Sequence, residues 1–297
     1  MPGRRRLLLT GATGYIASQL LPTLRERYDL VLCDLRETDR EGRPVDGLQI
    51  ANLADPDLER NRRLFEGVDT VVHLAYNHRQ RDPEQDYFDE RVNVDMAYNV
   101  YRLTQQAGGR RVVMASSNHA ADLWEHPIWQ RRLDGISPDA PRPLSDNFYG
   151  WAKEAYEHLG FVFAAGGAGR PIEVVQIRIG APRPIRAESF FSAERNDPVA
   201  YTRDLGAYVS PRDLAQLFVK SVEAEDVRNE WGVPFQVFYG ISGNTRAFWS
   251  IANARRVIGY EPEDDAEHTF RDEIVRYLDR SPFAGPLVSG RDRRGGL

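Results

Sequence analysis

The chain alternates short apolar runs with longer stretches in which apolar residues recur every three or four positions. Short apolar runs are typical of buried strands, and the longer pattern is typical of amphipathic helices that cover them. We expect six strands in the first 180 residues, at about 5–10, 29–34, 47–52, 69–75, 111–117 and 172–178. Strands that alternate with helices in this way wind into a parallel sheet.

Two of the expected helices are long, at about 83–107 and 147–165, and the alternation weakens beyond residue 180. The proline-rich segment 180–201 reads as a long loop, which is uncommon inside a compact domain unless it covers a site. The pattern then predicts a smaller lobe, made of a helix near 211–225, a strand at 235–240 and helices near 246–257 and 265–279.

The composition is that of an ordinary globular chain, with 41% hydrophobic and 28% charged residues. The net charge of -5 argues against a general nucleic-acid binder. No apolar run approaches the roughly 20 residues of a membrane helix, and the opening "MPGRRRLLLT" reads as a first strand rather than a signal peptide. The single cysteine, Cys33, fits a reducing compartment, so we expect a cytoplasmic protein. The histidines lack ligand spacing with cysteine or paired acids, and we expect no metal.

A glycine motif follows the first expected strand directly. "TGATGYIAS" places Gly11, Gly14 and Ala17 at the start of a helix. In a dinucleotide-binding turn, Gly11 would make the tight turn and Gly14 would let a diphosphate approach the backbone amides at the helix N-terminus. Ala17 would keep helix and strand close. The context of strand, glycine turn and helix therefore predicts a dinucleotide site.

Asp34 stands twenty residues after Gly14, at the end of the second expected strand. A carboxylate there accepts both hydroxyls of an adenosine ribose and repels a 2′-phosphate, which favours NAD over NADP. The nearby Arg36 leaves use of both open. We therefore expect an α/β fold with a Rossmann-type doubly wound parallel sheet. Residues 1–179 would form the NAD-binding and catalytic domain, 180–280 a small substrate lobe interleaved with it, and 281–297 a loose tail.

The strand at 111–117 runs straight into polar side chains, Ser116, Ser117, Asn118 and His119. A strand made only for packing usually closes with turn residues, so this cluster indicates a site at the carboxyl edge of the sheet.

A tyrosine and a lysine follow on the next long helix. Tyr149 and Lys153 are four residues apart and share one helix face. A Lys ammonium about 6 Å from the phenol lowers the pKa of the tyrosine by about 2 at an effective dielectric near 20. The spacing alone arises by chance in amphipathic helices, so its place after the other motifs carries the argument.

Together these motifs resemble the extended short-chain dehydrogenase/reductase family. The resemblance implies that Ser117 hydrogen-bonds the reacting oxygen, that Tyr149 is the general base, and that Lys153 activates it and anchors a ribose. "Asn52-Leu53-Ala54-Asp55" resembles the adenine-side Asp-Leu-x-Asp stretch with Asn in the first place, and "VVHLA" resembles the strand beneath the cofactor. Besides Gly11, Gly14, Asp34 and Lys153, the implied cofactor contacts are Tyr15, Ile16, Asn52, Leu53, Leu74, Ala75 and Asn93.

Within that family, "SSNH", the Tyr-Gly-x-x-Lys helix and "RIG" at 178–180 are similar to uronate dehydrogenases, and the similarity covers about residues 5–280. It implies oxidation of a free hexuronic acid at C1 to an aldonolactone, with NAD. Asn118 and His119 would line the sugar, and Arg203 would hold its carboxylate. It also implies a homodimer formed by the two long helices.

Departures from the uronate dehydrogenases keep other functions open. Extra residues at about 120–135 include Trp124 and Trp129, which either stack on a sugar or anchor the loop, and Ala181 stands where a polar residue is usual. The alternatives are a nucleotide-sugar epimerase or dehydratase, and a dehydrogenase of a neutral sugar or of a sugar phosphate. An NAD-sensing regulatory binder would lack the Tyr-Lys pair. A substrate that carries a phosphate stays open because the long loop holds three arginines, Arg183, Arg186 and Arg195.

Overall fold

Seven parallel strands form one sheet in the computed structural model, which describes residues 4–77, 82–139, 142–192 and 194–278. The strands are β1 (Arg6–Thr10), β2 (Asp29–Asp34), β3 (Leu48–Ile50), β4 (Thr70–His73), β5 (Arg111–Ser117), β6 (Glu173–Ile179) and β7 (Phe235–Gly240). Their spatial order is β3-β2-β1-β4-β5-β6-β7, so the direction of winding reverses between β1 and β4. The predicted doubly wound parallel sheet is confirmed, and ligands of such sheets bind where the winding reverses.

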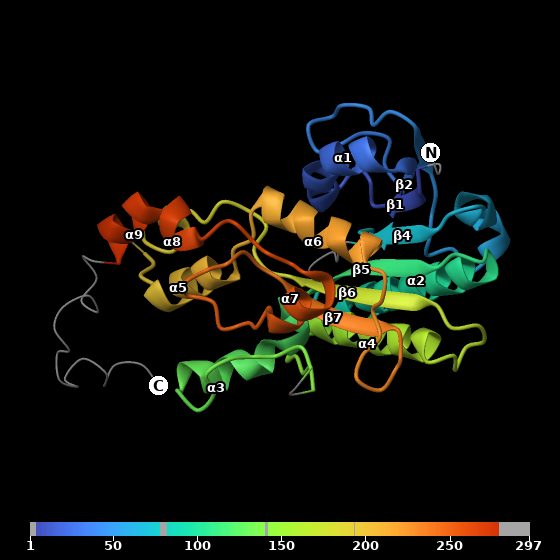
Figure 1. Cartoon of the computed structure of the whole chain (residues 1–297). Coiled ribbons are helices and arrows are strands. Elements are labelled where there is room, and N and C mark those ends of the chain that lie inside the picture. Colours follow the sequence, from blue (N-terminus) through green and yellow to red (C-terminus); the bar gives the residue numbers. More distant parts are fainter. Residues whose placement is uncertain (1–3, 78–81, 140–141, 193, 279–297) are drawn as a thin grey trace.

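Helices cover both faces of the sheet (Figure 1). Helix α1 (Tyr15–Arg27) packs beside α6 (Pro211–Glu223) on one face, and α2 (Asp86–Gln106) packs beside α4 (Phe148–Ala164) on the other. Side chains of a strand alternate between the faces, so β1 contributes Leu7 and Leu9 to the core under α1 and Leu8 to the core under α2. Burial on both faces is why β1 reads as an unbroken apolar run.

The remaining helices are short. They are η1 (Leu58–Arg60), η2 (Arg62–Phe65), η3 (Asn118–Trp124), α3 (Glu125–Trp129), η4 (Ala187–Ser189), α5 (Pro198–Ala207), α7 (Ala252–Ile258), α8 (Ala266–Thr269) and α9 (Arg271–Tyr277). The segment 265–279, predicted as one helix, is broken at Phe270 into α8 and α9, and its residue 279 lies outside the described residues.

Placing 211–225 and 235–240 in the small lobe was wrong. Strand β7 pairs in parallel with β6 as the last strand of the sheet, and α6 packs against α1. An apolar run looks the same in either position, and only its pairing partner decides between them. The division at residues 179 and 180 stays a prediction, and the expected tail at 281–297 lies outside the described residues.

The lobe has an apolar core of its own, built around buried residues such as Tyr201, Leu205 and Trp249. Figure 1 shows α3, α5, α8 and α9 together at one end of the sheet. The lobe joins the sheet just after β6, where the backbone N–H of Ala181 donates to the carbonyl of Ala207 at 2.7 Å. The 120–135 segment contributes to this core through Trp124, Ile128 and Leu133.

A buried ion pair fixes α4 against the carboxyl end of the sheet. Arg178 on β6 donates to both carboxylate oxygens of Glu157 on α4, at 3.0 and 2.7 Å. Ser116 also donates to Glu157, at 2.5 Å, and Arg178 donates to the hydroxyl of Tyr239 at 3.1 Å. Buried charges require such partners, and these tie β5, β6, β7 and α4 together.

The junction of sheet and lobe requires a glycine at position 180. A Cβ at Gly180 would overlap the carbonyl oxygen of Ala207, which is backbone and cannot rotate away. We expect Gly180→Ala to lower the free energy of unfolding by about 1–3 kcal/mol, measured by urea denaturation. Gly243→Ala is the control, because its Cβ would make an ordinary contact of 3.4 Å. Equal stability of the two variants would contradict the close approach.

Candidate functional site

The glycine turn after β1 lies where the winding reverses. Gly11 has φ +68°, and a Cβ there would lie 2.6 Å from the backbone nitrogen of Ala75 after β4. Only glycine therefore lets the segments after β1 and β4 meet. Gly14 precedes α1, whose first turn has neither a side-chain cap nor an acidic residue among the described residues. The amides at this end, which include those of Tyr15 and Ile16, form a donor set suited to a diphosphate.

Asp34 ends β2 beside this turn. One carboxylate oxygen accepts from the backbone N–H and the hydroxyl of Thr13, at 3.0 and 2.7 Å. The other accepts from the backbone N–H groups of Leu35 and Arg36, at 2.7 and 3.3 Å. The carboxylate is thus held next to the glycine turn, as a ribose acceptor requires.

Two predicted cofactor residues, Asn52 and Leu53, follow β3. Leu53 is buried after β3, and its carbonyl accepts from the side chain of Asn99 at 2.8 Å. The side-chain oxygen of Asn52 accepts from the N–H of Ala54 at 3.1 Å, which closes a local turn. This segment is therefore packed against α2.

The segment after β4 is held by side chains below it. The N–H groups of Leu74 and Ala75 lie 3.3 Å from the hydroxyl of Thr10. Asn93 on α2 is buried and exchanges hydrogen bonds with the backbone of Asn77, at 2.7 and 3.1 Å. Asn93 thus holds the chain that follows β4 in place. The sequence alone could not reveal this contact, because it joins α2 to the segment after β4.

Tyr149 and Lys153 lie on the first two turns of α4. Asn147 caps this helix by accepting from the N–H of Gly150 at 2.9 Å. The Lys153 ammonium donates to the carbonyl of Ala115 at 3.2 Å and lies 5.3 Å from the ring centroid of Tyr149. Burial lowers the pKa of Lys153 to about 8, although two buried glutamates oppose the shift. The lysine is therefore a desolvated cation beside the tyrosine ring.

Two rings flank Tyr149 edge-on. The imidazole of His119 lies 5.7 Å from it and the ring of Tyr76 lies 5.6 Å from it, between centroids. The hydroxyl of Tyr76 donates to the fully buried carboxylate of Glu90 at 2.5 Å. Sequence reasoning missed Tyr76 and Glu90, and only the position of Tyr76 just after "VVHLA" could have drawn attention to it.

The end of β5 carries a buried donor that lacks an acceptor. Ser117 accepts from the N–H of His119 at 3.2 Å and lies 3.4 Å from the side-chain oxygen of Asn118. Asn118 is 2% exposed, and its Nδ2 has no hydrogen-bond partner among the described residues. Because buried N–H groups are nearly always paired in folded proteins, this one indicates a ligand oxygen.

His119 is oriented by an acid that sequence reasoning missed. Its Nδ1 lies 2.9 and 3.0 Å from the carboxylate oxygens of Asp122. A carboxylate only accepts, so Nδ1 carries a proton, and in the neutral ring Nε2 is then an acceptor. Asn147 also donates to Asp122, at 3.2 Å, which links the cap of α4 to His119. Two features of the sequence could have pointed to this group. Asp122 follows His119 by three residues, and Asn147 stands at the cap of the helix that carries Tyr149.

Arg203 on α5 lies beyond Asp122, which is 3.9 Å from its guanidinium. Its Nε and Nη2 donate to the two carboxylate oxygens of Glu125 at 2.8 and 2.7 Å, and its Nη1 donates to Asp204 at 3.2 Å. The carboxylate of Asp122 thus lies between Arg203 and His119. The two donors of Arg203 that together bind a planar anion, Nε and Nη2, are occupied by Glu125.

The two tryptophans of the 120–135 segment make structural contacts. The indole N–H of Trp124 donates to the carbonyl of Arg142 at 2.7 Å, and Trp129 packs edge-on against Phe248 at 5.5 Å. Both contacts are those of loop anchors, one of the two roles considered.

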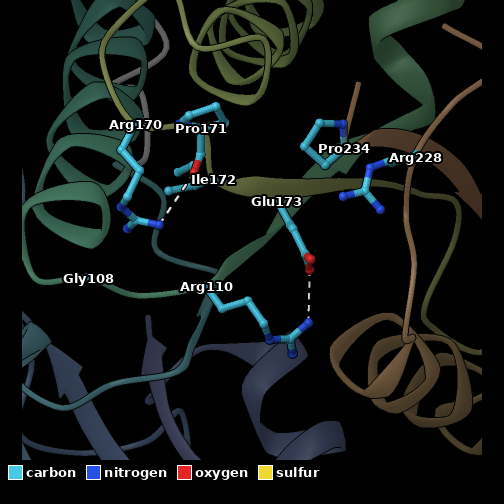
Figure 2. A pocket seen from close by; sticks show the side chains of 8 residues that line it. All are labelled: Gly108, Arg110, Arg170, Pro171, Ile172, Glu173, Arg228 and Pro234. Carbon is cyan, nitrogen blue, oxygen red and sulfur yellow. Dashed lines mark hydrogen bonds and ion pairs between the residues drawn. The ribbon is translucent and has the colours of Figure 1, made fainter. Parts of the chain in front are cut away.

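A separate hollow of about 320 Å³ lies at the amino ends of β5 and β6, opposite the polar cluster (Figure 2). Three arginines line it, but Arg110 pairs with Glu173 at 2.9 Å and Arg228 pairs with Asp226 at 3.1 Å. Arg170 donates to backbone carbonyls, including that of Gly109 at 2.8 Å. The charged side chains that line this hollow are thus committed to structural contacts.

Within the described residues, no group of three or more histidines, cysteines or acids is arranged to hold a metal ion. None of the described helices combines the length and apolar character that crossing a membrane requires.

The comparisons with known proteins agree with this geometry. The NAD-dependent glucose-6-phosphate dehydrogenase of Haloferax volcanii is 32% identical over 281 residues, which cover 90% of this chain and 97% of that protein. The L-arabinose 1-dehydrogenase (NAD(P)(+)) of the same organism is 30% identical and covers 88% of this chain and 97% of its own. A crystal structure of a mutant uronate dehydrogenase from Agrobacterium tumefaciens, complexed with NAD, aligns with a TM-score of 0.68 at 25% identity. This alignment covers 92% of this chain and 89% of that one.

These findings confirm the resemblance to uronate dehydrogenases and identify NAD as the cofactor. The residues present fit this cofactor, because the uncapped amides at the start of α1 would bind its diphosphate and the Asp34 carboxylate would accept from its ribose hydroxyls. The model of the NAD dependent epimerase/dehydratase family matches residues 7–177, more than half of the sequence. The chain therefore belongs to the NAD dependent epimerase/dehydratase family.

Proposed function

We propose that this protein oxidises C1 of a free sugar or sugar acid in its ring form to a lactone, with NAD as the hydride acceptor. The observation that carries the proposal is the tyrosine and buried lysine of α4 facing the polar end of β5. Tyr149 lies 5.3 Å from the Lys153 ammonium, and Asn118 nearby has an unpaired donor among the described residues. The relatives named above are dehydrogenases of a sugar phosphate, of a neutral sugar and of a uronate, which agrees with oxidation of a sugar.

Each side chain has a distinct part in the reaction. Tyr149, as the phenolate, removes the proton of the C1 hydroxyl while the C1 hydrogen leaves as hydride and the C1–O bond becomes a carbonyl. Ser117 and Asn118 donate to the reacting oxygen and hold it in place. Lys153 stabilises the phenolate by its charge. NAD supplies an acceptor for the hydride when it is bound.

His119 would position the sugar ring. The Asp122 carboxylate keeps the proton on Nδ1, so Nε2 of the neutral ring is an acceptor for a sugar hydroxyl. Because Asn147 joins Asp122 to the first turn of α4, the imidazole and Tyr149 keep a fixed relation.

The identity of the sugar is a finer question. Sequence reasoning favoured a hexuronate whose carboxylate is held by Arg203, but the edge of the guanidinium that would bind it is occupied by Glu125. For a sugar phosphate, the cations considered in the loop after β6 are partly committed, since Arg183 pairs with Asp204 at 2.8 Å and Arg195 with Asp197 at 3.1 Å. We place the reaction in the cytoplasm and in carbohydrate metabolism as part of the same proposal.

Removing the phenol hydroxyl tests the base. We expect Tyr149→Phe to lower kcat by about a thousandfold or more, because the ring remains while the proton acceptor is lost. Binding of NAD, followed by titration calorimetry, should change by no more than a few fold. Tyr98→Phe, on the exposed face of α2, is the control and should keep its activity. Sustained NAD reduction by Tyr149→Phe over a panel of sugars would refute this role.

Removing the buried ammonium of Lys153 tests how much its burial lowers the stability of the folded protein. In the folded protein its pKa is about 8, against 10.5 for an ordinary lysine, which corresponds to about 3 kcal/mol. Below pH 8 both states are protonated and the full penalty is present; between pH 8 and 10.5 the folded state binds fewer protons and wild-type stability rises. We expect Lys153→Met to be inactive in the presence of NAD and substrate. In unfolding experiments without NAD, we expect it to be more stable than wild type at pH 7. The carbonyl of Ala115 keeps a partner in Tyr156 at 2.9 Å.

Unfolding by urea at pH 7 and at pH 9.5 measures both effects for Lys153→Met. The stability advantage of the variant should shrink at the higher pH, because wild type gains stability there. A variant less stable than wild type at pH 7 would show that burial of the ammonium is not a net cost.

We also propose a homodimer, formed by α2 and α4. Exposed aromatic side chains cluster on these helices, with the ring of Tyr87 5.8 Å from Phe148 and 5.4 Å from Trp151. Phe88 beside them is 51% exposed. An apolar patch of this kind is typical of an interaction surface.

Light scattering at micromolar concentration should give twice the chain mass for wild type. Phe88→Asp should shift it toward the monomer, because burying a carboxylate in an apolar interface is unfavourable. Trp231→Asp is the control, since Trp231 is 76% exposed in the loop between α6 and β7 and belongs to neither helix. A monomeric wild type would rule out the dimer.

A further inference from the structure

The two-pronged edge of the Arg203 guanidinium is already filled by a carboxylate of the same chain. Its Nε and Nη2, the pair that binds a planar anion through two parallel hydrogen bonds, lie 2.8 and 2.7 Å from the oxygens of Glu125. A substrate carboxylate needs the same two donors. It would therefore have to displace Glu125 before Arg203 could hold it.

The pair is also largely removed from water. The side chain of Arg203 is 19% exposed and that of Glu125 is 13% exposed. Arg203 packs over the ring of Trp249, 5.4 Å from its centroid, which limits the movement of the guanidinium. Separating such a pair leaves a poorly hydrated carboxylate without its counter-ion, which is strongly unfavourable.

The surroundings add negative charge rather than positive charge. Asp122 and Asp204 lie 3.9 and 3.2 Å from the same guanidinium. Besides Arg203, Asp204 contacts only one further cation in the described part of the chain, Arg183, whose side chain is 56% exposed. Three carboxylates thus face two guanidiniums, and an additional anion would meet net repulsion.

This acidic group belongs to the site described above. Asp122 contacts both His119, at 2.9 Å, and Arg203. His119 in turn lies edge-on to Tyr149. Glu125 begins α3 in the 120–135 segment, where the sequence departs from the uronate dehydrogenases that it resembles. The carboxylate that occupies Arg203 thus comes from the segment in which that departure lies.

We propose that Glu125 is a specificity-determining residue, which occupies Arg203 in place of a substrate anion and directs the enzyme to a neutral aldose. The proposal rests on the proposed C1 oxidation and names its substrate class. The far end of the sugar then carries hydroxyl groups, which donate to carboxylates such as Asp122 and Glu125 in short, charge-assisted hydrogen bonds. A hexuronate would present a carboxylate to the same carboxylates.

The test uses sugars that differ only in the group on C5. Galacturonate, galactose and L-arabinose share their ring stereochemistry and carry a carboxylate, a hydroxymethyl group and a hydrogen there. Wild type should have a kcat/KM on one of the two neutral sugars at least about tenfold above that on galacturonate. Glu125→Ala should raise the galacturonate-to-neutral ratio by at least about tenfold, a change of about 1.4 kcal/mol. The same comparison with glucuronate, glucose and xylose covers the other common configuration.

A matched control is available in the lobe. Arg246 and Glu267 form an equivalent two-pronged pair at 2.6 and 2.9 Å, so Glu267→Ala removes the same kind of carboxylate elsewhere and should leave the ratio unchanged within about twofold. The double variant Glu125→Ala/Arg203→Ala should lose the gain on the uronate, because that gain depends on the freed guanidinium. Glu125→Gln keeps the shape and removes the charge, and it should shift the ratio in the same direction. It replaces Glu125→Ala in the test if that variant does not fold.

Three outcomes overturn the inference. A wild type that prefers the uronate would show that Glu125 does not exclude an anion. An unchanged ratio in folded Glu125→Ala and Glu125→Gln would remove Glu125 as the determinant while leaving C1 oxidation intact. Absence of NAD reduction with every sugar of both series would overturn the proposed function, and the substrate class with it.

Discussion

The site depends on the close approach of the first turn of α4 to the chain just after β5. A Cβ at Gly150 would overlap both the carbonyl oxygen of His119 and the hydroxyl of Ser145, so only glycine lets these segments touch. Tyr149 is the residue before this contact and His119 lies within it. The distance between the proposed base and the polar end of β5 is therefore set by backbone packing, which is stiffer than any side-chain contact.

Behind this contact, polar groups that are expensive to bury keep the helix in place. The Glu157–Arg178 pair ties α4 to β6, and Asn147 joins the start of α4 to Asp122. Lys153 is buried next to Tyr149 with its pKa lowered, which a protein selected only for stability would avoid. Unfavourable burial at a site and strong pairing around it are the expected signature of residues retained for chemistry.

The far side of the site is built differently. Its residues come from the 120–135 segment and from α5, two parts of the chain that pack together in the lobe core. The proposed reacting end thus rests on the regular geometry of strands and long helices, whereas the proposed substrate end rests on short helices and loops. Such a division lets one fold act on different sugars by changing loops alone.

The sequence by itself determined the periodic elements and their local chemistry. Apolar runs buried on both faces, such as β1, are visible as unbroken stretches, and the glycine turn, Asp34 and the Tyr149–Lys153 spacing follow from local rules of turns and helices. Pairing between distant segments decided the rest. Nothing local distinguishes β7 in the sheet from a strand of the lobe, or a free Arg203 from one bound to Glu125, 78 residues away. Such contacts depend on how the whole chain packs, because a hydrogen bond has no signature in the sequence of either partner.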